Sequence, residues 1–195
     1  MHLEELRMIF PDLRVIFILR DPREMMASLK FITQKVGGDG QPGQYHPVVY
    51  SLYWRDAAET IARYAVEEPG LVCRVKFEDL ISKPNAEAAR LADFLGSRVE
   101  GDVMRTDANT SFSSAARKSI TPTEMWICEK IAGDAMRERA YPLSGERPRF
   151  RDVGDLVRVS LRFTQYQIGR IIRDTARRES IKAFVRRRFG KRTSS

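Results

Sequence analysis

The sequence is poor in the residues that build metal centres and disulfide frameworks. Its 195 residues include two cysteines, Cys73 and Cys128, and two histidines, His2 and His46. These are too few for a disulfide scaffold or a zinc site, so we expect no metal and a reducing, cytoplasmic setting. We expect both thiols to be buried and inert, and both histidines to be surface residues without a chemical role.

Long hydrophobic runs are missing as well. Apolar stretches such as Val15–Leu19 are far too short to cross a bilayer, and the acidic start at Met1–Glu5 lacks the basic region of a signal peptide. What the sequence does contain is 43% hydrophobic and 9% aromatic residues, which is enough for a core and excludes wholesale disorder. The length suits one domain, with or without an appendage.

Charge is divided unevenly along the chain. The net charge is +8, but residues 147–195 hold 15 Lys and Arg against 4 Asp and Glu, whereas residues 1–146 hold 19 against 22. The division falls at Leu143–Pro148, a turn-rich stretch that is typical of a linker. We therefore predict a body over 1–146 and a basic helical tail over 147–195. The charge of the body does not favour nucleic acid as a partner.

The periodicity of apolar residues predicts an α/β order with only two credible strands. Two apolar parallel strands leave hydrophobic faces and edges uncovered, so we expect a partial α/β domain. Either it is the C-terminal part of a larger domain, or another chain completes it, or a further strand lies near residues 98–104. The predicted elements are helices over 3–10, 21–31, 48–66, 84–95 and 121–139, strands over 13–19 and 71–77, and mostly loop over 35–47 and 97–120.

The end of the first strand carries the candidate site. Arg20 follows the strand directly, and Asp21, Pro22 and Glu24 then start a helix in the pattern of a capping box. Ligands of open α/β sheets bind beyond the carboxyl ends of strands, and the planar guanidinium of Arg20 suits a phosphate. Ser28, two turns into the helix, adds a hydroxyl. The alternative is that Arg20 pairs with Asp21 or Glu24 and that Ser28 only packs.

The stretch Arg20–Ser28, directly after an apolar strand, resembles the 3′-phosphate-binding motif of sulfotransferases that use 3′-phosphoadenosine 5′-phosphosulfate (PAPS). In that family the Arg and the Ser eight residues later grip the 3′-phosphate, which implies this role for Arg20 and Ser28. Further stretches resemble the bacterial members in the same order. These are Val72–Leu80, Pro84, Phe94–Gly96, Asn109–Phe112, the helix that starts at Thr121, and Ala140–Pro142.

The resemblance implies a partial three-layer, parallel-sheet, P-loop-like fold and further nucleotide contacts. Phe77 stands where the family has a tyrosine, which keeps an aromatic face and loses a hydroxyl. Thr110, Ser111 and Phe112 match the segment whose Phe flanks the adenine. The arginine-rich loop that follows is short here, so Arg117 or the lysine after it either substitutes as a 3′-phosphate ligand or is a solvated charge.

The resemblance also implies what this chain does not supply. The family's 5′-phosphosulfate loop and its catalytic base have no counterpart here, so we expect both upstream of Met1 and no catalytic residue in the chain. The complete enzyme then transfers a sulfuryl group from PAPS to a hydroxyl or amine of a small-molecule, glycan or lipid acceptor, and the isolated chain is inactive. The alternative is an inactive remnant that binds nucleotide or membrane through its basic tail.

The tail has a pattern of its own. Apolar residues at helical spacing run from Asp152 to Phe189, and arginines line one side of the last part, Ile181–Phe189. One hypothesis is that the tail lies on an anionic membrane at its inner face, with apolar side chains inserted and arginines on the head groups. The other is a helix packed on the body with a solvated basic face.

Several conspicuous residues receive structural interpretations. Trp54 lies among apolar residues of the long helix over 48–66, so we expect it in the core. Met25 and Met26 are expected to pack there or to form a pocket wall. Glu78 and Asp79 are adjacent carboxylates that point apart, and we expect them to cap the turn after the second strand.

Overall fold

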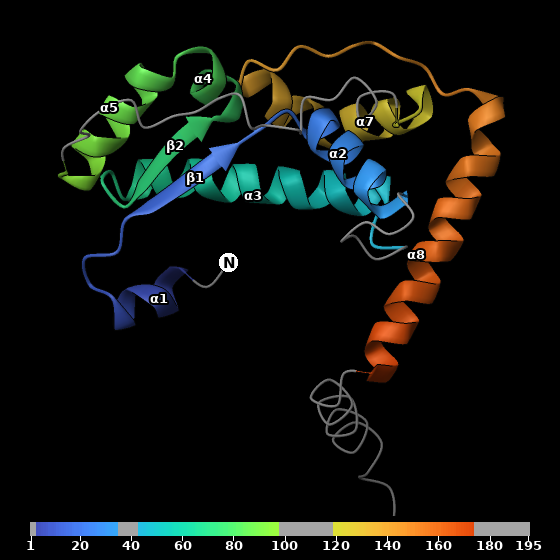
Figure 1. Cartoon of the computed structure of the whole chain (residues 1–195), viewed down its shortest axis with the longest axis horizontal. Helices are drawn as coiled ribbons and strands as arrows, with labels where there is room; N and C mark the ends of the chain where they lie inside the picture. Colours follow the sequence, from blue (N-terminus) through green and yellow to red (C-terminus); the bar gives the residue numbers. More distant parts are fainter. Residues whose placement is uncertain (1–2, 35–42, 98–118, 174–195) are drawn as a thin grey trace, which may run out of the picture.

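A computed structural model of the chain describes residues 3–34, 43–97 and 119–173. Within these ranges it is a helix-rich α/β protein around one short parallel sheet (Figure 1). The predicted α/β class and the parallel pairing of the two strands are confirmed. Most of the loop predicted over 35–47, the further strand considered near 98–104 and the second part of the tail lie outside the described residues.

The sheet consists of β1 (Val15–Leu19) and β2 (Val72–Lys76). The register runs from Val15 beside Val72 to Leu19 beside Lys76. Both strands are rich in β-branched residues, which favour a pleated surface packed by helices. The helices are α1 (Leu3–Ile9), α2 (Pro22–Gln34), α3 (Pro47–Glu67), α4 (Phe77–Ser82), α5 (Pro84–Leu95), α7 (Pro122–Glu138) and α8 (Val153–Arg173), with the 3-10 turn η2 (Phe150–Asp152) before α8.

Helix α3 lies at the centre of the core. Near the sheet it contributes Ile61 and Tyr64 to an apolar cluster with the strands, and elsewhere it runs beside α7. Trp54 is buried in the larger cluster between α2, α3 and α7, as predicted. The most deeply buried side chains of this cluster are Met26, Cys128, Ala132 and Met136. Each large apolar side chain buried here contributes about 1.5–3 kcal/mol, so this cluster is a main source of the packing energy.

Helices cover both faces of the sheet, but incompletely. Phe17 of β1 packs in the cluster with α3, whereas α5 lies on the other face, where Arg90 contacts the sulfur of Cys73. The alternation of side chains places Ile16 and Ile18 on that second face, and they are 39% and 56% exposed. The described helices therefore leave this part of β1 open, and the arrangement is a partial three-layer one.

The ends of the elements follow their local chemistry, with one correction. Helix α7 starts with a capping box at the predicted Thr121, because the Thr121 hydroxyl accepts from the Glu124 amide and the Glu124 carboxylate accepts from the Thr121 amide. Gly96 ends α5 in the left-handed conformation, with φ 65°. The strand predicted over 71–77 ends at Lys76, because Phe77 is already the first residue of the short helix α4.

Helix α8 is attached to the body at its start by a buried carboxylate. Asp152 Oδ2 accepts hydrogen bonds from the amide and the hydroxyl of Thr123, at 3.2 and 2.8 Å. Thr123 lies in the first turn of α7, where the helix dipole favours a negative charge. Although burial opposes it, donation from Thr123 lowers the pKa of Asp152. The tail is therefore fixed to the body at the point where α8 begins.

Farther along, α8 lies against the segment that precedes α3. The Tyr166 hydroxyl accepts a hydrogen bond of 3.1 Å from Gln44, and Val159 is buried in the larger cluster. The close approach depends on Gly43, whose φ is +92° and where an added Cβ would lie 2.5 Å from the carbonyl oxygen of Arg162. One side of α8 is thus packed on the body.

His46 is not the surface residue that the loop composition predicts. It is half-buried just before α3, where its Nε2 lies 3.2 Å from the Ser160 hydroxyl and its ring centroid 5.1 Å from that of Phe163. Burial lowers the pKa of His46, although Glu124 acts in the opposite direction. The imidazole therefore belongs to the contact between α3 and α8. His2 lies outside the described residues.

Both cysteines are free and buried, as predicted. Burial raises the pKa of the Cys128 thiol to about 11, so this thiol is protonated near neutral pH. Of the helices that the structure describes, none combines the length and the apolar character needed to cross a bilayer.

Candidate functional site

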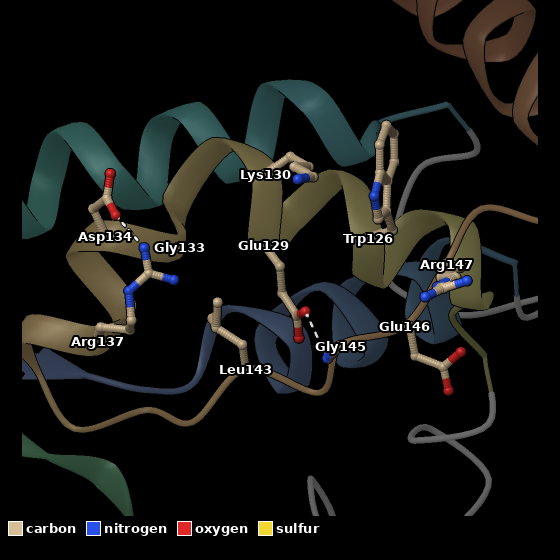
Figure 2. Close-up of a pocket in the computed structure, with 10 residues that line it drawn as sticks. All are labelled: Trp126, Glu129, Lys130, Gly133, Asp134, Arg137, Leu143, Gly145, Glu146 and Arg147. Carbon is tan, nitrogen blue, oxygen red and sulfur yellow. Dashed lines mark hydrogen bonds and ion pairs between the residues drawn. The ribbon is translucent and has the colours of Figure 1, made fainter.

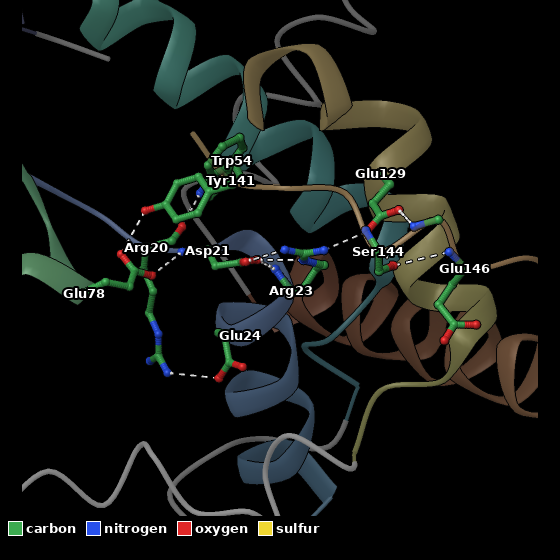
Figure 3. A network of polar contacts seen from close by, with 11 residues as sticks. Arg20, Asp21, Arg23, Glu24, Trp54, Glu78, Glu129, Tyr141, Ser144 and Glu146 are labelled. Carbon is green, nitrogen blue, oxygen red and sulfur yellow. Dashed lines mark hydrogen bonds and ion pairs between the residues drawn. The ribbon is translucent and has the colours of Figure 1, made fainter. Parts of the chain in front are cut away.

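The site predicted from the sequence forms where β1 ends and α2 begins (Figure 3). Arg20 directly follows β1, and its side chain is 17% exposed. Its guanidinium carbon lies 4.7 Å from the ring centroid of Phe77, and one of its nitrogens lies 3.7 Å from the Glu24 carboxylate. The cation–π contact holds the guanidinium at the carboxyl edge of the sheet, which is where open α/β sheets bind ligands.

Of the capping box predicted at the start of α2, the structure shows the bond to the Asp21 side chain but not the return bond from Glu24. The Asp21 carboxylate accepts from the Arg23 amide at 2.9 Å, so it caps the helix as predicted. Glu24 instead faces Arg20, and the Asp21 amide donates to Glu78 Oε1 at 3.0 Å. Of the two carboxylates considered as partners of Arg20, Asp21 is engaged by the Arg23 side chain and Glu24 contacts Arg20.

Glu78 and Tyr141 also lie at the site, although the sequence predicts no contact between them and the turn from β1 to α2. The position of Glu78 after β2 predicts that it caps the turn that follows. Its carboxylate instead accepts hydrogen bonds from two groups that are distant in the sequence. Its Oε1 accepts from the Asp21 amide and its Oε2 from the Tyr141 hydroxyl, each at 3.0 Å. Burial, reinforced by the charge of Glu78, raises the pKa of Tyr141, so the phenol remains a donor. Glu78 thereby joins the β1–α2 turn to the segment after α7.

Trp54 has a role beyond the core packing that the sequence predicts. Its indole Nε1 donates a 2.9 Å hydrogen bond to the carbonyl oxygen of Arg20. Its ring meets that of Tyr141 edge to face, with centroids 6.2 Å apart. The backbone on both sides of the Arg20–Asp21 peptide is therefore bonded to groups from other elements, which fixes the direction in which the Arg20 side chain leaves the strand.

The polar network continues from Arg23 to α7 (Figure 3). Arg23 Nη1 bonds to Glu129 at 2.8 Å, and Glu129 also accepts from the amide and the hydroxyl of Ser144 at 2.7 Å. Burial alone would raise the pKa of Glu129, but donation from Ser144 and Arg23 outweighs it and lowers the pKa. The stretch 143–148, predicted as a linker, is therefore bonded to Glu129 of α7, which in turn bonds to Arg23 of α2.

A cavity of about 490 Å³ lies beside α7, next to this fastened stretch (Figure 2). Its charged side chains balance, with three cations against three carboxylates. Such a balance gives the cavity no net charge that would favour an anion. The lining residues are Trp126, Glu129, Lys130, Gly133, Asp134, Arg137, Leu143, Gly145, Glu146 and Arg147.

Ser28 lies in α2, two turns after its start, and is half-buried. It is four residues from Glu24, so the two share one face of the helix. Because Glu24 contacts Arg20, Ser28 lies on the side of α2 that faces the arginine. The remaining predicted nucleotide contacts, Thr110, Ser111, Phe112 and Arg117, lie outside the described residues.

The chemistry that this arrangement offers is anion binding. Asp21 already caps α2, so the donors suited to a phosphate are the side chains of Arg20 and Ser28 rather than the helix amides. In the part of the chain that the structure describes, His, Cys, Asp and Glu nowhere gather in a group of three that could hold a metal ion.

Comparisons with known proteins bear on the same stretch of chain. The family model described as "Sulfotransferase family" matches residues 1–101, which include Arg20, Ser28 and Phe77. A solved structure, "Sulfotransferase Domain from the Curacin Biosynthetic Pathway", is similar with 21% identity over 74% of this chain and a TM-score of 0.40. The chain spans about half the length of that domain, 54% of it. The comparison with curated proteins found no match.

Proposed function

Since the chain belongs to the sulfotransferase family, we propose that it serves sulfuryl transfer from PAPS to a hydroxyl or amine acceptor and that it binds the 3′-phosphate end of the nucleotide. Arg20 and Ser28 hold the 3′-phosphate, and Phe77 supports the guanidinium from behind. The segment with Thr110, Ser111, Phe112 and Arg117 supplies the adenine side. The acceptor is a small molecule, a glycan or a lipid, and the proposal assigns no catalytic residue to this chain.

The observation that carries the proposal is the fixed position of Arg20. Its guanidinium stacks on Phe77, and its carbonyl oxygen accepts from Trp54. The next amide along the chain, that of Asp21, donates to Glu78. A charged group held in advance loses little conformational freedom when it binds, which is what a phosphate ligand needs.

The contact with Glu24 is compatible with phosphate binding. At 3.7 Å it is longer than a charge-assisted hydrogen bond, which is about 2.7–2.9 Å. A phosphate offers the guanidinium two short parallel bonds and a larger negative charge. We therefore expect the nucleotide to displace Glu24 from Arg20 without disturbing the stack on Phe77.

The 3′-phosphate contact makes no covalent bond and acts through position. When bound, PAPS supplies the sulfuryl group at its other end, far from the 3′-phosphate. Arg20 and Ser28 fix the nucleotide so that its reacting end is held in one place, which lowers the entropic part of the barrier. They also distinguish PAPS from nucleotides that lack a 3′-phosphate, since such nucleotides would leave the arginine without its bidentate partner.

Titration calorimetry of the full chain with adenosine 3′,5′-bisphosphate tests the proposal. Arg20→Ala should weaken binding by about 1.5–3 kcal/mol, the contribution of a hydrogen bond to a charged group. This corresponds to a loss of affinity of roughly ten- to hundredfold. Equal affinity of the two proteins would remove Arg20 from the site.

Two controls separate a specific contact from a general charge effect. Arg55 lies on the exposed side of α3, where it pairs with Asp56, so Arg55→Ala removes the same charge away from the site and should bind like the wild type. Adenosine 5′-monophosphate lacks the 3′-phosphate, so its weaker binding should not depend on Arg20. A similar loss in Arg55→Ala would mean that the affinity reflects net charge alone.

A further inference from the structure

One side of α8 and of the turn before it carries a continuous row of exposed apolar side chains. Successive members are three, four or seven residues apart, so they share one face of the helix. Their exposed fractions run from 49% to 98%, with Phe150 at the upper limit. The row, called the α8 stripe below, consists of Phe150, Val153, Val157, Leu161, Ile168 and Ile172. A connected apolar patch of this kind on a protein surface marks an interaction site.

The opposite side of α8 is already occupied by the body. Val159 is buried in the core, Ser160 contacts His46, and Tyr166 accepts from Gln44. These residues alternate with the members of the stripe along the helix, so the stripe points away from the body. Figure 1 shows α8 running along one side of the molecule, with its last part extending past α2 and α3. The helix is thus held in place while its apolar face is presented outward.

The charges around the stripe are mainly positive. Residues 147–173 hold seven Lys and Arg against two Asp and Glu. One of the two carboxylates, Asp152, is buried and bonded to Thr123, and the other, Asp155, pairs with Arg158 at 2.9 Å. The sequence continues this bias, because residues 174–195 hold eight Lys and Arg against two Asp and Glu. The charge of this region is therefore complementary to an anionic surface.

Pairing of two copies through the stripe is the competing arrangement, because spacings of three and four also suit two packed helices. Arg151 and Arg158 directly follow Phe150 and Val157, so they border the stripe. In a pair of α8 helices these arginines would bring like charges together along the seam. An anionic partner turns the same arginines into favourable contacts.

We propose that α8 docks lengthwise on an anionic lipid bilayer. The α8 stripe enters the boundary between head groups and acyl chains, and Arg151, Arg158 and Arg162 lie on the lipid phosphates. The helix lies in the plane of the membrane and does not span it, in keeping with its charged side. Two signals combine in this surface, an apolar face and a basic flank, which is what stable peripheral binding requires.

The test is flotation of the full chain with two kinds of vesicle. Wild-type chain should partition at least about tenfold more strongly onto phosphatidylcholine vesicles with about 30 mol% phosphatidylserine than onto pure phosphatidylcholine. Replacing Val157, Leu161 and Ile168 with serine should lower partitioning onto the anionic vesicles by about tenfold or more. The double variant Arg151→Gln and Arg162→Gln should lower it without touching the apolar face.

A matched control makes the same kind of substitution on helices other than α8. Replacing Met8, Tyr53 and Val66 with serine also removes three exposed apolar side chains, all from other helices, and should leave partitioning unchanged. Equal partitioning onto both vesicle types would overturn the proposal, as would wild-type binding by the stripe variant. Sedimentation equilibrium gives a further arm: a wild-type dimer that the stripe variant converts to monomer would make the stripe a protein interface instead.

Discussion

Tyr141 joins three parts of the molecule through one hydroxyl and one ring. Its hydroxyl donates to Glu78, its ring packs edge to face on Trp54, and the Lys76 ammonium lies 5.0 Å from the ring centroid. Through Glu78 and Trp54 it acts on both sides of the Arg20 peptide. The residue therefore positions the groups that hold the Arg20–Asp21 peptide.

Tyr141→Phe should lower the free energy of unfolding by about 1.5–3 kcal/mol, because it leaves one oxygen of Glu78 without its donor while keeping the ring. Urea denaturation measures the change. Tyr53→Phe removes a hydroxyl from a tyrosine that is 65% exposed and should change stability by less than about 0.5 kcal/mol. If the two variants are equally stable, the bond to Glu78 makes no net contribution.

The residues of the site fall into two groups, those that the neighbouring sequence identifies and those that only long-range contacts bring there. Phe77 becomes a candidate only through the resemblance to the family, whereas the places of Arg20 and Ser28, at the end of a strand and on the next helix, can be predicted from the local sequence. Glu78 and Tyr141 cannot, because their partners lie 57 and 63 residues away and nothing in either neighbourhood encodes the contact. For a similar reason the sequence predicts His46 to be an exposed loop residue, because its contacts with α8 are more than a hundred residues away in the chain.

At the scale of the elements, one part of the attachment of α8 is a close approach of its backbone to Gly43. Gly43 lies in a backbone conformation that L side chains rarely adopt, and α8 leaves no room for a Cβ there. The other contacts of this region, from Gln44 and His46, follow within three residues. A change at Gly43 therefore acts on the position of the whole helix.

Gly43→Ala should destabilise the fold by about 1–3 kcal/mol, the cost of a disfavoured backbone conformation, and should loosen α8. Gly154→Ala is the matched control, since Gly154 is in the first turn of α8 with no atom near its would-be Cβ, and it should be neutral or slightly stabilising. Urea denaturation gives the energies, and hydrogen exchange of the α8 amides gives the loosening. Two variants with the same exchange in α8 would show that Gly43 does not control its attachment.

Elements with a clear start signal could be predicted, whereas those without one could not. The capping box of α7 and Gly96 after α5 set boundaries that the structure reproduces within a residue or two. Helix α4 could not be predicted from the sequence, because Phe77 continues the apolar pattern of β2. The packing of α8 is hidden for another reason, since a periodic apolar pattern does not say which face meets the body.

For the whole molecule, stability should fall as the solution becomes acidic. Burial lowers the pKa of His46 from its ordinary value of 6.5, so the unfolded chain takes up a proton that the folded chain resists. The groups that face this imidazole are Ser160, Phe163 and the more distant carboxylate of Glu124. The contribution of His46 to the free energy of unfolding is fully present well above pH 6.5, the value in the unfolded chain. It is lost as the pH falls from there through the lowered pKa of the folded state.

A second loss should follow at lower pH from two carboxylates. Donors hold the pKa of Glu129 below 4.5 and that of Asp152 below 3.8, so their contributions are present above these values and vanish as the pH falls through the lowered ones. The urea midpoint should drop between pH 7.5 and 5.5 and again below pH 4.5. His46→Gln should remove the first drop only, and an unchanged wild-type midpoint between pH 7.5 and 5.5 would contradict the role of His46.

The segregation of charge has a consequence for how the molecule moves before any contact is made. Among the described residues, 147–173 carry a net +5 along one side of the structure, whereas 3–34, 43–97 and 119–146 together hold 14 Lys and Arg against 18 Asp and Glu, a net −4. Two separated charges of opposite sign form a permanent dipole, and an external field exerts a torque on it. Near any negatively charged surface the molecule is turned with α8 leading, so encounters are oriented within a Debye length of about 8 Å at physiological ionic strength.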